Sequence, residues 1–480
     1  MKSRFKSNVL YNVAYQIIAL LTPLLTAPYL SRVIGAEGVG TYAYTNSVAS
    51  YFFLFAMLGV NNYGNRLVAQ TRDNKNKVSE SFWQVYYIQL FGTIVWLILY
   101  LLLCFRLNNE NNKVIFYIQS LYVFSAALDV NWFIFGLEKF KVAAIRSTLV
   151  KIISVLLIFV LVKNKQDTWI YTVIIVLGNI VGLLLVWPIV FKETQIQKPN
   201  FDIIVRHLKP NFILFIPLIA STAFSGIGKT ILGILKNEEE VGYYNYATNI
   251  MNIPLTAIDA IGTVLMPRLS NLLVNEKDNN ITKKVIEEVV LYTSIIGVGM
   301  GAGMAAVAPT FVPLYLGEDY IPTANYLALL AIGIPIAGLG SIIRMAYLIP
   351  YGKDKEYTKA IVLGAIINIF VGGIGAKILG TYGICLAMLI SYLMVFIVQL
   401  NAMKEDFHVN ILIKKTVPYW GIGIFMAIVI LNLSSFIENK LLLLAAQIIV
   451  GVIIYGSLSL FSLVVLNKDE MVKVFLRKKR

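Results

Sequence analysis

Residues 441–466 read LLLLAAQIIVGVIIYGSLSLFSLVVL and contain no charged side chain. A helix that crosses the hydrocarbon core of a bilayer needs about 20 consecutive apolar residues, so this run is long enough for one crossing. Transmembrane strands would instead show alternating segments of about 10 residues. The stretch therefore predicts a transmembrane helix.

Similar runs fill the rest of the chain. Of its 480 residues 58% are apolar and 14% charged, and the mean hydropathy is +0.74. Soluble domains are about half apolar and a quarter charged, so the composition excludes a water-soluble protein. We expect an all-α polytopic membrane protein with about 14 spans and short loops, at 9–31, 41–60, 82–104, 114–135, 147–163, 169–190, 211–233, 241–265, 286–309, 322–343, 358–378, 383–403, 416–435 and 441–466.

The basic residues are distributed unevenly between the loops. Successive loops between the predicted spans lie on alternate sides of the membrane. Of the 41 lysines and arginines, 32 fall on the same side as the two termini. Basic loops stay in the cytoplasm, so we predict a multi-pass membrane protein with both termini cytoplasmic. The run 9–31 lacks a small-residue cleavage site and is interpreted as a retained first span rather than a signal peptide. The net charge of +15 thus serves orientation and contact with anionic lipids, not nucleic acid.

An internal repeat divides the chain. Residues 35–48 (GAEGVGTYAYTNSV) match residues 237–250 (NEEEVGYYNYATNI) at an offset of 202, and 136–145 echo 352–361 more weakly. Duplication is favoured over chance similarity between helix starts. Six spans per repeat predict two pseudo-symmetric lobes, 1–205 and 206–410, with the substrate between them. Residues 411–480 then hold two extra spans and a basic tail.

Several segments resemble the Wzx-type polysaccharide flippases of the multidrug, oligosaccharidyl-lipid and polysaccharide exporter group, whose lobes have a MATE- and MurJ-like arrangement. The likeness covers nearly the whole chain and is clearest at 29–47 (YLSRVIGAEGVGTYAYTNS), 128–151 (LDVNWFIFGLEKFKVAAIRSTLVK), 229–250 (KTILGILKNEEEVGYYNYATNI), 266–270 (MPRLS) and 313–320 (PLYLGEDY).

This resemblance implies a function. It implies a cationic cavity between two lobes and the flipping of undecaprenyl-diphosphate-linked oligosaccharides for surface polysaccharide synthesis, alongside a polymerase and glycosyltransferases. We expect a monomeric transporter rather than an enzyme, because the short loops leave no room for a catalytic domain. The alternatives are a MATE-like multidrug or cation antiporter and a lipid II flippase, and a membrane polysaccharide polymerase fits the short loops less well. The sequence departs from several relatives at Gly228, where they carry an acidic residue.

Four cations are candidates for binding a lipid diphosphate. An ionisable residue inside a span is costly and marks a functional site by default, and both Arg and Lys bind phosphate. Arg32 and Lys229 are placed at comparable depths on the leading helices of the two lobes. Snorkelling to the interface is the competing interpretation for residues near span ends. The four candidates are Arg32, Lys229, Arg344 and Arg66.

Two carboxylates are candidates for coupling to H⁺ or Na⁺. Asp129 and Asp259 lie inside predicted spans, where a carboxylate beside a low-dielectric cavity titrates at accessible pH. The competing interpretation is a structural one, in which each carboxylate pairs with a neighbouring basic or amide group such as Asn131 or Asn252.

Other chemistry is excluded. Residues 223–230 (AFSGIGKT) fit a relaxed phosphate-loop pattern, but they lie in an apolar span without a preceding strand. The two histidines, His207 and His408, are predicted in cytoplasmic loops, and Cys104 and Cys385 lie in spans. No metal site, catalytic constellation or cofactor is expected.

Overall fold

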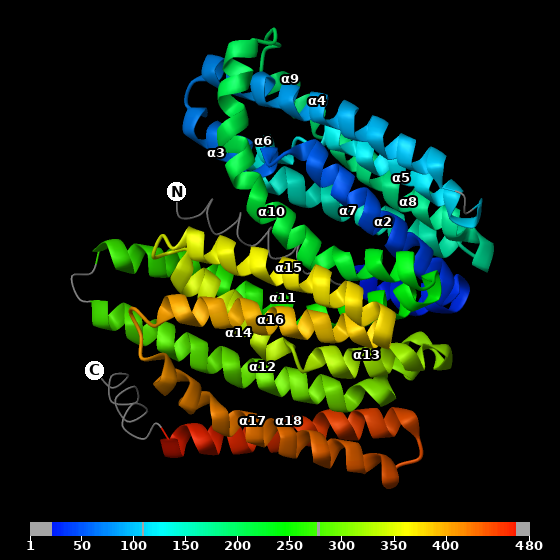
Figure 1. The fold of residues 1–480 in the computed structure, drawn as a ribbon, viewed down its shortest axis with the longest axis vertical. Coiled ribbons are helices and arrows are strands. Elements are labelled where there is room, and N and C mark those ends of the chain that lie inside the picture. The colour runs from blue at the N-terminus through cyan, green and yellow to red at the C-terminus, as the bar shows by residue number, and fades with distance from the viewer. Residues whose placement is uncertain (1–21, 108–109, 276–278, 467–480) are drawn as a thin grey trace. The chain divides into compact units, whose positions relative to one another are not determined.

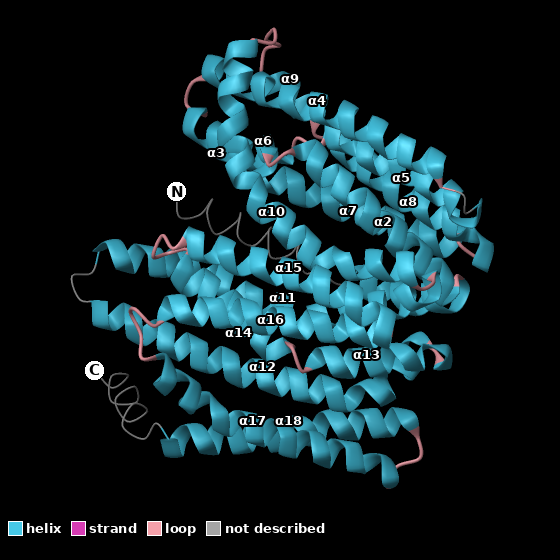
Figure 2. Ribbon diagram, in the orientation of Figure 1, coloured by secondary structure: helices cyan, strands magenta, loops and turns pink. Residues whose placement is uncertain are grey.

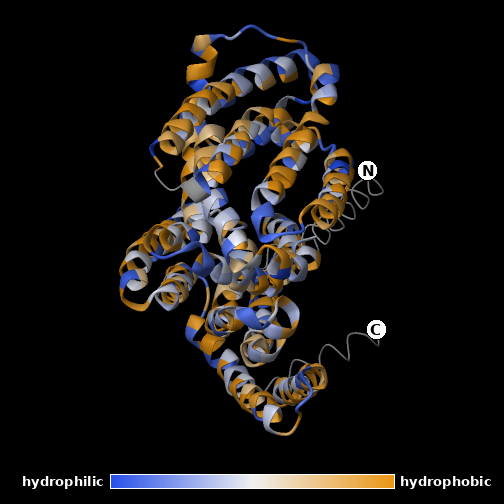
Figure 3. Ribbon diagram, turned by 90° about the vertical axis from the view of Figure 1, so that its right-hand side faces the viewer, coloured by the Kyte–Doolittle hydropathy of each residue, from blue (hydrophilic) through white to orange (hydrophobic). Residues whose placement is uncertain are grey.

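The computed structural model describes residues 22–107, 110–275 and 279–466 (Figure 1). Within these residues the chain is built of helices joined by short loops, and no strand is present (Figure 2). Hydrophobic residues occur along most helices, while hydrophilic residues gather at many of the loops (Figure 3). The prediction of an all-α membrane protein is confirmed.

The predicted spans correspond to helices of the structure. Twelve helical segments of the described chain are long and apolar enough to cross a membrane, and a bent pair, Glu318–Ala331 with Ile334–Leu348, makes up to 13. These segments match the last 13 of the 14 predicted spans in order. Of the first predicted span, residues 9–21 lie outside the described residues, and 22–33 are helical. The basic N-terminus and tail also lie outside the described residues.

The contacts divide the chain into two compact units, Met1–Gly242 and Tyr243–Arg480. The main helices of the first unit are α2 (Gly35–Met57), α3 (Val60–Thr71), α4 (Lys75–Arg106), α5 (Glu110–Leu128), α6 (Asn131–Gly136), α7 (Phe140–Leu161), α8 (Thr168–Leu184), α9 (Trp187–Glu193) and α10 (Phe201–Leu235). In its core α2 packs on α4 and α5, and α5 packs on α8.

The second unit begins inside α11 (Glu238–Asn275). Its helices pack mainly on α12, which contacts α13, α14, α17 and α18, while α15 and α16 form a close pair. In Figure 1 α17 and α18 run side by side as an orange and red hairpin. These helices are α12 (Asn279–Leu316), α13 (Ile321–Ala331), α14 (Ile334–Ile343), α15 (Asp354–Leu379), α16 (Thr381–Met403), α17 (Val409–Asn432) and α18 (Lys440–Leu466).

Three details differ from the sequence-based interpretation. Helix α10, assigned to the second repeat, packs on α2, α3 and α4 of the first unit, so the compact units do not begin and end where the repeats do. The predicted lobes 1–205 and 206–410 stay a prediction about the duplication. His207 lies inside α10 rather than in a loop, because the helix starts ten residues before the apolar run at 211–233. Arg146, one residue before the predicted span 147–163, lies inside α7.

Each unit contains the same turn before its fifth repeat helix. Residues Lys139 and Lys353 precede α7 and α15 with nearly equal backbone angles, φ −86° and ψ 45° against φ −85° and ψ 43°. Both backbone N–H groups donate to the carbonyl five residues earlier, and the residue before each has positive φ. This is the hydrogen-bond pattern of a helix end closed by a left-handed residue. The turns align Lys139 with Lys353, two residues away from the register of the weak sequence echo.

The two lysines also form equivalent ion pairs. The Nζ atom of Lys139 lies 2.6 Å from Glu193 at the end of α9, and that of Lys353 lies 2.6 Å from Glu405 after α16. In both units the turn is therefore tied to the end of the sixth repeat helix. This repeated geometry supports the duplication independently of the matched residues.

Candidate functional site

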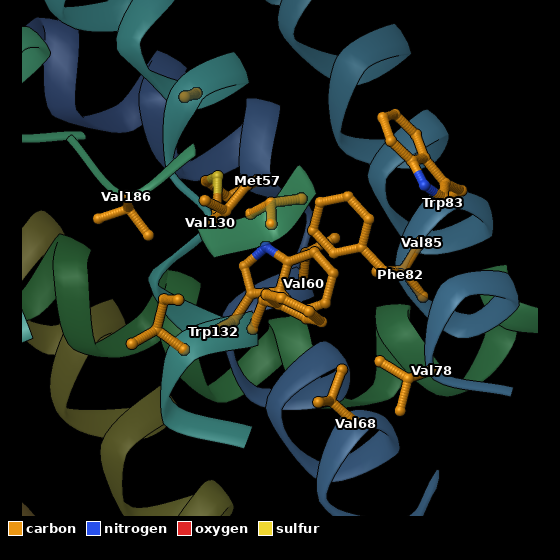
Figure 4. Packing of buried hydrophobic residues seen from close by; sticks show 14 of the residues in the cluster. Met57, Val60, Val68, Val78, Phe82, Trp83, Val85, Val130, Trp132 and Val186 are labelled. Atoms are coloured by element: carbon orange, nitrogen blue, oxygen red, sulfur yellow. The ribbon is translucent and has the colours of Figure 1, made fainter. Parts of the chain in front are cut away.

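Two helices of the first unit break side by side. The α2–α3 break lies at Leu58 and Gly59, both with positive φ, and the α5–α6 break lies at Asp129 and Val130. Met57, Val60, Val130 and Trp132, which flank the breaks, belong to one buried cluster (Figure 4). Discontinuous helices at membrane depth occur where they line functional sites in transporters, so this level of the first unit is a candidate site.

The side chain of Gln89 satisfies the groups that the α5–α6 break releases. From the middle of α4 its Nε2 atom donates to the carbonyls of Ala126 (2.5 Å) and Asp129 (3.0 Å), and its Oε1 atom accepts from Trp132 Nε1 (2.9 Å). The indole of Trp187 donates to the carbonyl of Leu128 at 3.1 Å. Because a buried carbonyl without a partner is costly, these contacts stabilise the break.

The carboxylate of Asp129 faces Asn131. One oxygen of Asp129, Oδ1, accepts from the backbone N–H (3.0 Å) and the side-chain Nδ2 (2.7 Å) of Asn131. The predicted structural pairing is thus present. The guanidinium of Arg146 lies near enough to attract Asp129, which makes the break a charged site. Its role in ion coupling stays a prediction.

Two cations at membrane depth are not among the four candidates of the sequence analysis. Arg146 and Lys151 both lie inside the candidate span Phe140–Leu161. The Nε and Nη1 atoms of Arg146 are buried, and its Nη2 atom donates to Ser147 at 3.0 Å. The apolar residues 142–145 (VAAI) were a signal that the helix starts before 147.

Lys229 lies beside a close contact between α2 and α10. Small residues of α10 face the aromatic and hydroxyl side chains of α2: Gly233 lies against Tyr44, and Thr230 Oγ1 is 2.9 Å from Ser47 Oγ. Lys229 itself is half-buried, and no described residue of the first unit forms an ion pair with it. The whole stretch 223–230 lies within the helix α10, as expected if it is not a phosphate loop.

The other two candidate phosphate ligands of the first unit, Arg32 and Arg66, are exposed. Arg32 lies on the helical segment 22–33, and its Nη1 atom donates to the carbonyl of Pro28 at 2.7 Å. Arg66 lies on the exposed side of α3. Arg32 and Lys229, predicted on different lobes, therefore fall in one compact unit.

In the second unit Asp259 and Arg344 are joined through a serine. Ser341 of α14 donates a short hydrogen bond to Asp259 Oδ1 of α11, and Arg344 Nη2 donates to Ser341 Oγ at 3.2 Å. The partner of Asp259 is thus Ser341 and not the predicted Asn252. The serine lies closer because α11 and α14 pack together along this stretch, with Gly338 against Ile258.

The second unit also contains an apolar cavity of about 1000 Å³. Its walls come from α11, α12, α13, α17 and α18, and include Pro254, Met300, Met426, Val452 and Leu463. The two extra C-terminal spans thus contribute one wall. A cavity with such a lining suits a hydrocarbon chain.

Comparison with known proteins decides the family. Residues 5–273 match the model of the family described as "Polysaccharide biosynthesis protein", which is more than half of the chain. The chain belongs to this family. Among the described residues no group of three or more His, Cys, Asp or Glu side chains could hold a metal ion.

Relatives and a solved structure agree with this family. A protein of Escherichia coli (strain K12) whose name gives it a proposed role as an O-antigen transporter is 26% identical over 77% of this chain and 89% of its own length. A protein of Shigella dysenteriae with the same name is 23% identical over 83% of this chain and 100% of its own length. The fold is similar to that of the lipid II flippase MurJ in an inward closed conformation, with a TM-score of 0.71, 17% identity, and 97% and 99% of the two chains covered.

Proposed function

We propose that this member of the polysaccharide biosynthesis family flips undecaprenyl-diphosphate-linked oligosaccharide repeat units across the bacterial plasma membrane by alternating access. The observation that carries the proposal is Lys229, a cation inside the apolar helix α10 with no ion-pair partner in the described part of its unit. Keeping a charge at membrane depth costs about 2.5–3.5 kcal/mol on insertion scales, and an anionic cargo would offset that cost.

Two further features support a lipid-linked cargo. The diphosphate would bind Lys229, with Arg32, Arg66 and Arg344 as further candidate ligands. The apolar cavity of the second unit would accept part of the polyprenyl chain, because it is lined almost entirely by hydrocarbon. Both names of the similar transporters point to the same class of cargo.

The same proposal includes the cytoplasmic orientation of both termini and a monomeric state. It also includes coupling to H⁺ or Na⁺ through Asp129 and Asp259. The MATE-like antiporter and the lipid II flippase stay as alternatives that differ in cargo. A cationic drug would be repelled by Lys229, whereas lipid II also carries a diphosphate.

The test is complementation in the source bacterium. Deletion of the gene should abolish the surface polysaccharide and cause the lipid-linked repeat unit to accumulate in the inner membrane. The wild-type gene should restore the polysaccharide. Unchanged polysaccharide with raised drug sensitivity would support the antiporter, and accumulation of lipid II would support the peptidoglycan precursor as cargo.

A further inference from the structure

A hydroxyl group links a carboxylate and a guanidinium at membrane depth in the second unit. Arg344 donates to Ser341, and Ser341 donates to Asp259, so one proton chain runs from cation to anion. No direct ion pair joins Asp259 and Arg344 in the described part of this unit. The hydrogen bonds of Ser341 therefore depend on both charges.

Packing around Ser341 holds the three residues in place. A methyl group at Gly338 would lie 2.7 Å from Ile258, and one at Gly262 would overlap the sulfur of Met345. Helix α11 is thus in close contact with the chain one turn before and one turn after Ser341. This close packing places the serine within hydrogen-bond distance of the carboxylate.

Arg344 is the first residue of an irregular helical segment. Residues Arg344–Leu348 form a π-helix directly after α14, an element often found at functional sites. The guanidinium carbon of Arg344 lies 5.7 Å from the ring centre of Tyr357 on α15, within the range of a cation–π contact. Of the five N–H groups of an arginine, Ser341 takes one, which leaves donors for an anion.

The charge on Asp259 determines how strongly Ser341 holds Arg344. While Asp259 is ionised, the serine proton points to the carboxylate and the serine lone pairs face Arg344. Once Asp259 is neutralised, its carboxyl proton competes for the same lone pairs, and the negative charge that attracts Arg344 is gone. Tyr392 of α16 is also in electrostatic contact with Asp259, but a tyrosine is a weak acid and does not supply a competing charge at neutral pH.

We propose that Asp259, Ser341 and Arg344 form one coupled site, in which neutralisation of Asp259 releases Arg344 to bind the diphosphate of the cargo. Ser341 is a positioning residue that transmits the change. By linkage, binding of the anion would favour neutralisation of Asp259 to the same extent. This inference rests on the proposed function, because it takes the anion to be the diphosphate of a lipid-linked sugar.

A double-mutant cycle with inorganic pyrophosphate tests the coupling on the purified full-length protein. Asp259→Asn should tighten pyrophosphate binding about fivefold or more, the lower end of typical couplings between sites. In the Ser341→Ala background the same change should have at most about a twofold effect. Ser341→Thr, which keeps the hydroxyl, should restore the full effect and also controls for folding. Binding that remains in Arg344→Gln is subtracted, since Lys229 is another candidate ligand.

Each result has a defined meaning. An equal effect of Asp259→Asn with and without Ser341 overturns the coupling, and so does the absence of any Arg344-dependent binding. If the cycle is non-additive but the protein does not flip lipid-linked sugars, the coupled anion site stands and the proposed function fails. If flipping occurs and the cycle is additive, only this inference is lost.

Discussion

Gly40 of α2 and Gly242 of α11 lie in close contact at the start of the two helices, within the first unit. A methyl group at Gly40 would overlap the carbonyl oxygen of Glu238, and one at Gly242 would overlap the carbonyl oxygen of Ala36. Both pairs, Gly40 with Gly242 and Ala36 with Glu238, are separated by the repeat offset of 202. The crossing is therefore symmetric, and the glycines allow the two backbones to approach as small residues do between membrane helices.

Substitution of either glycine should destabilise this crossing. Overpacking of a close contact costs about 1–3 kcal/mol, so Gly40→Ala and Gly242→Ala should each lower the melting temperature of the detergent-purified protein. Gly373→Ala in α15 is the matched control, because nothing lies within 4 Å of the added methyl group. Equal melting temperatures for all three variants would contradict the crossing.

Removal of the Gln89 amide should weaken the α5–α6 break. Gln89→Met keeps the size of the buried side chain but leaves the carbonyls of Ala126 and Asp129 and the indole of Trp132 without this partner. Each lost buried partner costs about 1–3 kcal/mol, so we expect a large fall in folded protein in the membrane. The same change at the exposed Gln70 of α3 should have no effect. Normal levels of Gln89→Met would show that the break is stabilised in another way.

The cluster around Asp406 should make the stability of the second unit depend on pH. The hydroxyl of Tyr347 donates to Asp406 at 2.6 Å and, with Lys353, holds the pKa of Asp406 below its usual range. Burial alone would lower the pKa of Lys353, but hydrogen bonds to Glu405, Tyr347 and Asp406 outweigh it and raise that pKa. The stabilisation from Asp406 is then complete above the unfolded pKa of about 4 and is lost as the pH falls through its lower folded pKa. The stabilisation from Lys353 is complete below its unfolded pKa of about 10 and is lost as the pH rises through its raised folded pKa.

The variant Tyr347→Phe tests this dependence. It should lower stability by about 1.5 kcal/mol near neutral pH, and the difference from the wild type should shrink as the pH falls below about 4. Thermal unfolding of the purified protein between pH 3 and pH 7 measures both effects. Tyr117→Phe is the control, because it makes the same change at a side chain that is exposed on α5. A difference that is constant over this pH range would be inconsistent with a depressed pKa of Asp406.

The charge of Lys229 should be needed for transport. Lys229→Gln should reduce polysaccharide export about tenfold or more, as expected for the loss of a hydrogen bond between charged groups. Lys229→Arg should keep part of the activity, because Arg also binds phosphate. Lys236→Gln, at the exposed end of α10, should export normally. If Lys229→Gln exports at the wild-type level with normal protein amounts, Lys229 does not bind the cargo.

The long apolar runs predicted the spans well, because a bilayer imposes length and composition on each crossing. The breaks could not be predicted in this way. Asp129 and Asn131 lie inside the predicted span 114–135, but polar residues inside a span do not by themselves predict a break. The break depends on Gln89, 40 positions earlier in the chain, which donates to its carbonyls.

The candidate site residues show the same limit of local patterns. Asp129 and Asn131 are two residues apart, and their contact was predicted correctly. The contact of Asp259 with Ser341 joins residues 82 positions apart and depends on how α11 packs on α14. Arg146 was assigned outside the span, because its helix starts at Phe140 and the uninterrupted apolar run starts later.

The most direct test of the central claim is a transport measurement with purified components. The protein is reconstituted into vesicles that contain an undecaprenyl-diphosphate-linked oligosaccharide in both leaflets, and an added glycosidase removes sugar from the outer leaflet only. We predict that vesicles with the protein lose nearly all of the sugar, whereas empty vesicles and vesicles with Lys229→Gln lose only the outer share. Equal loss from vesicles with and without the protein would contradict the proposed flippase.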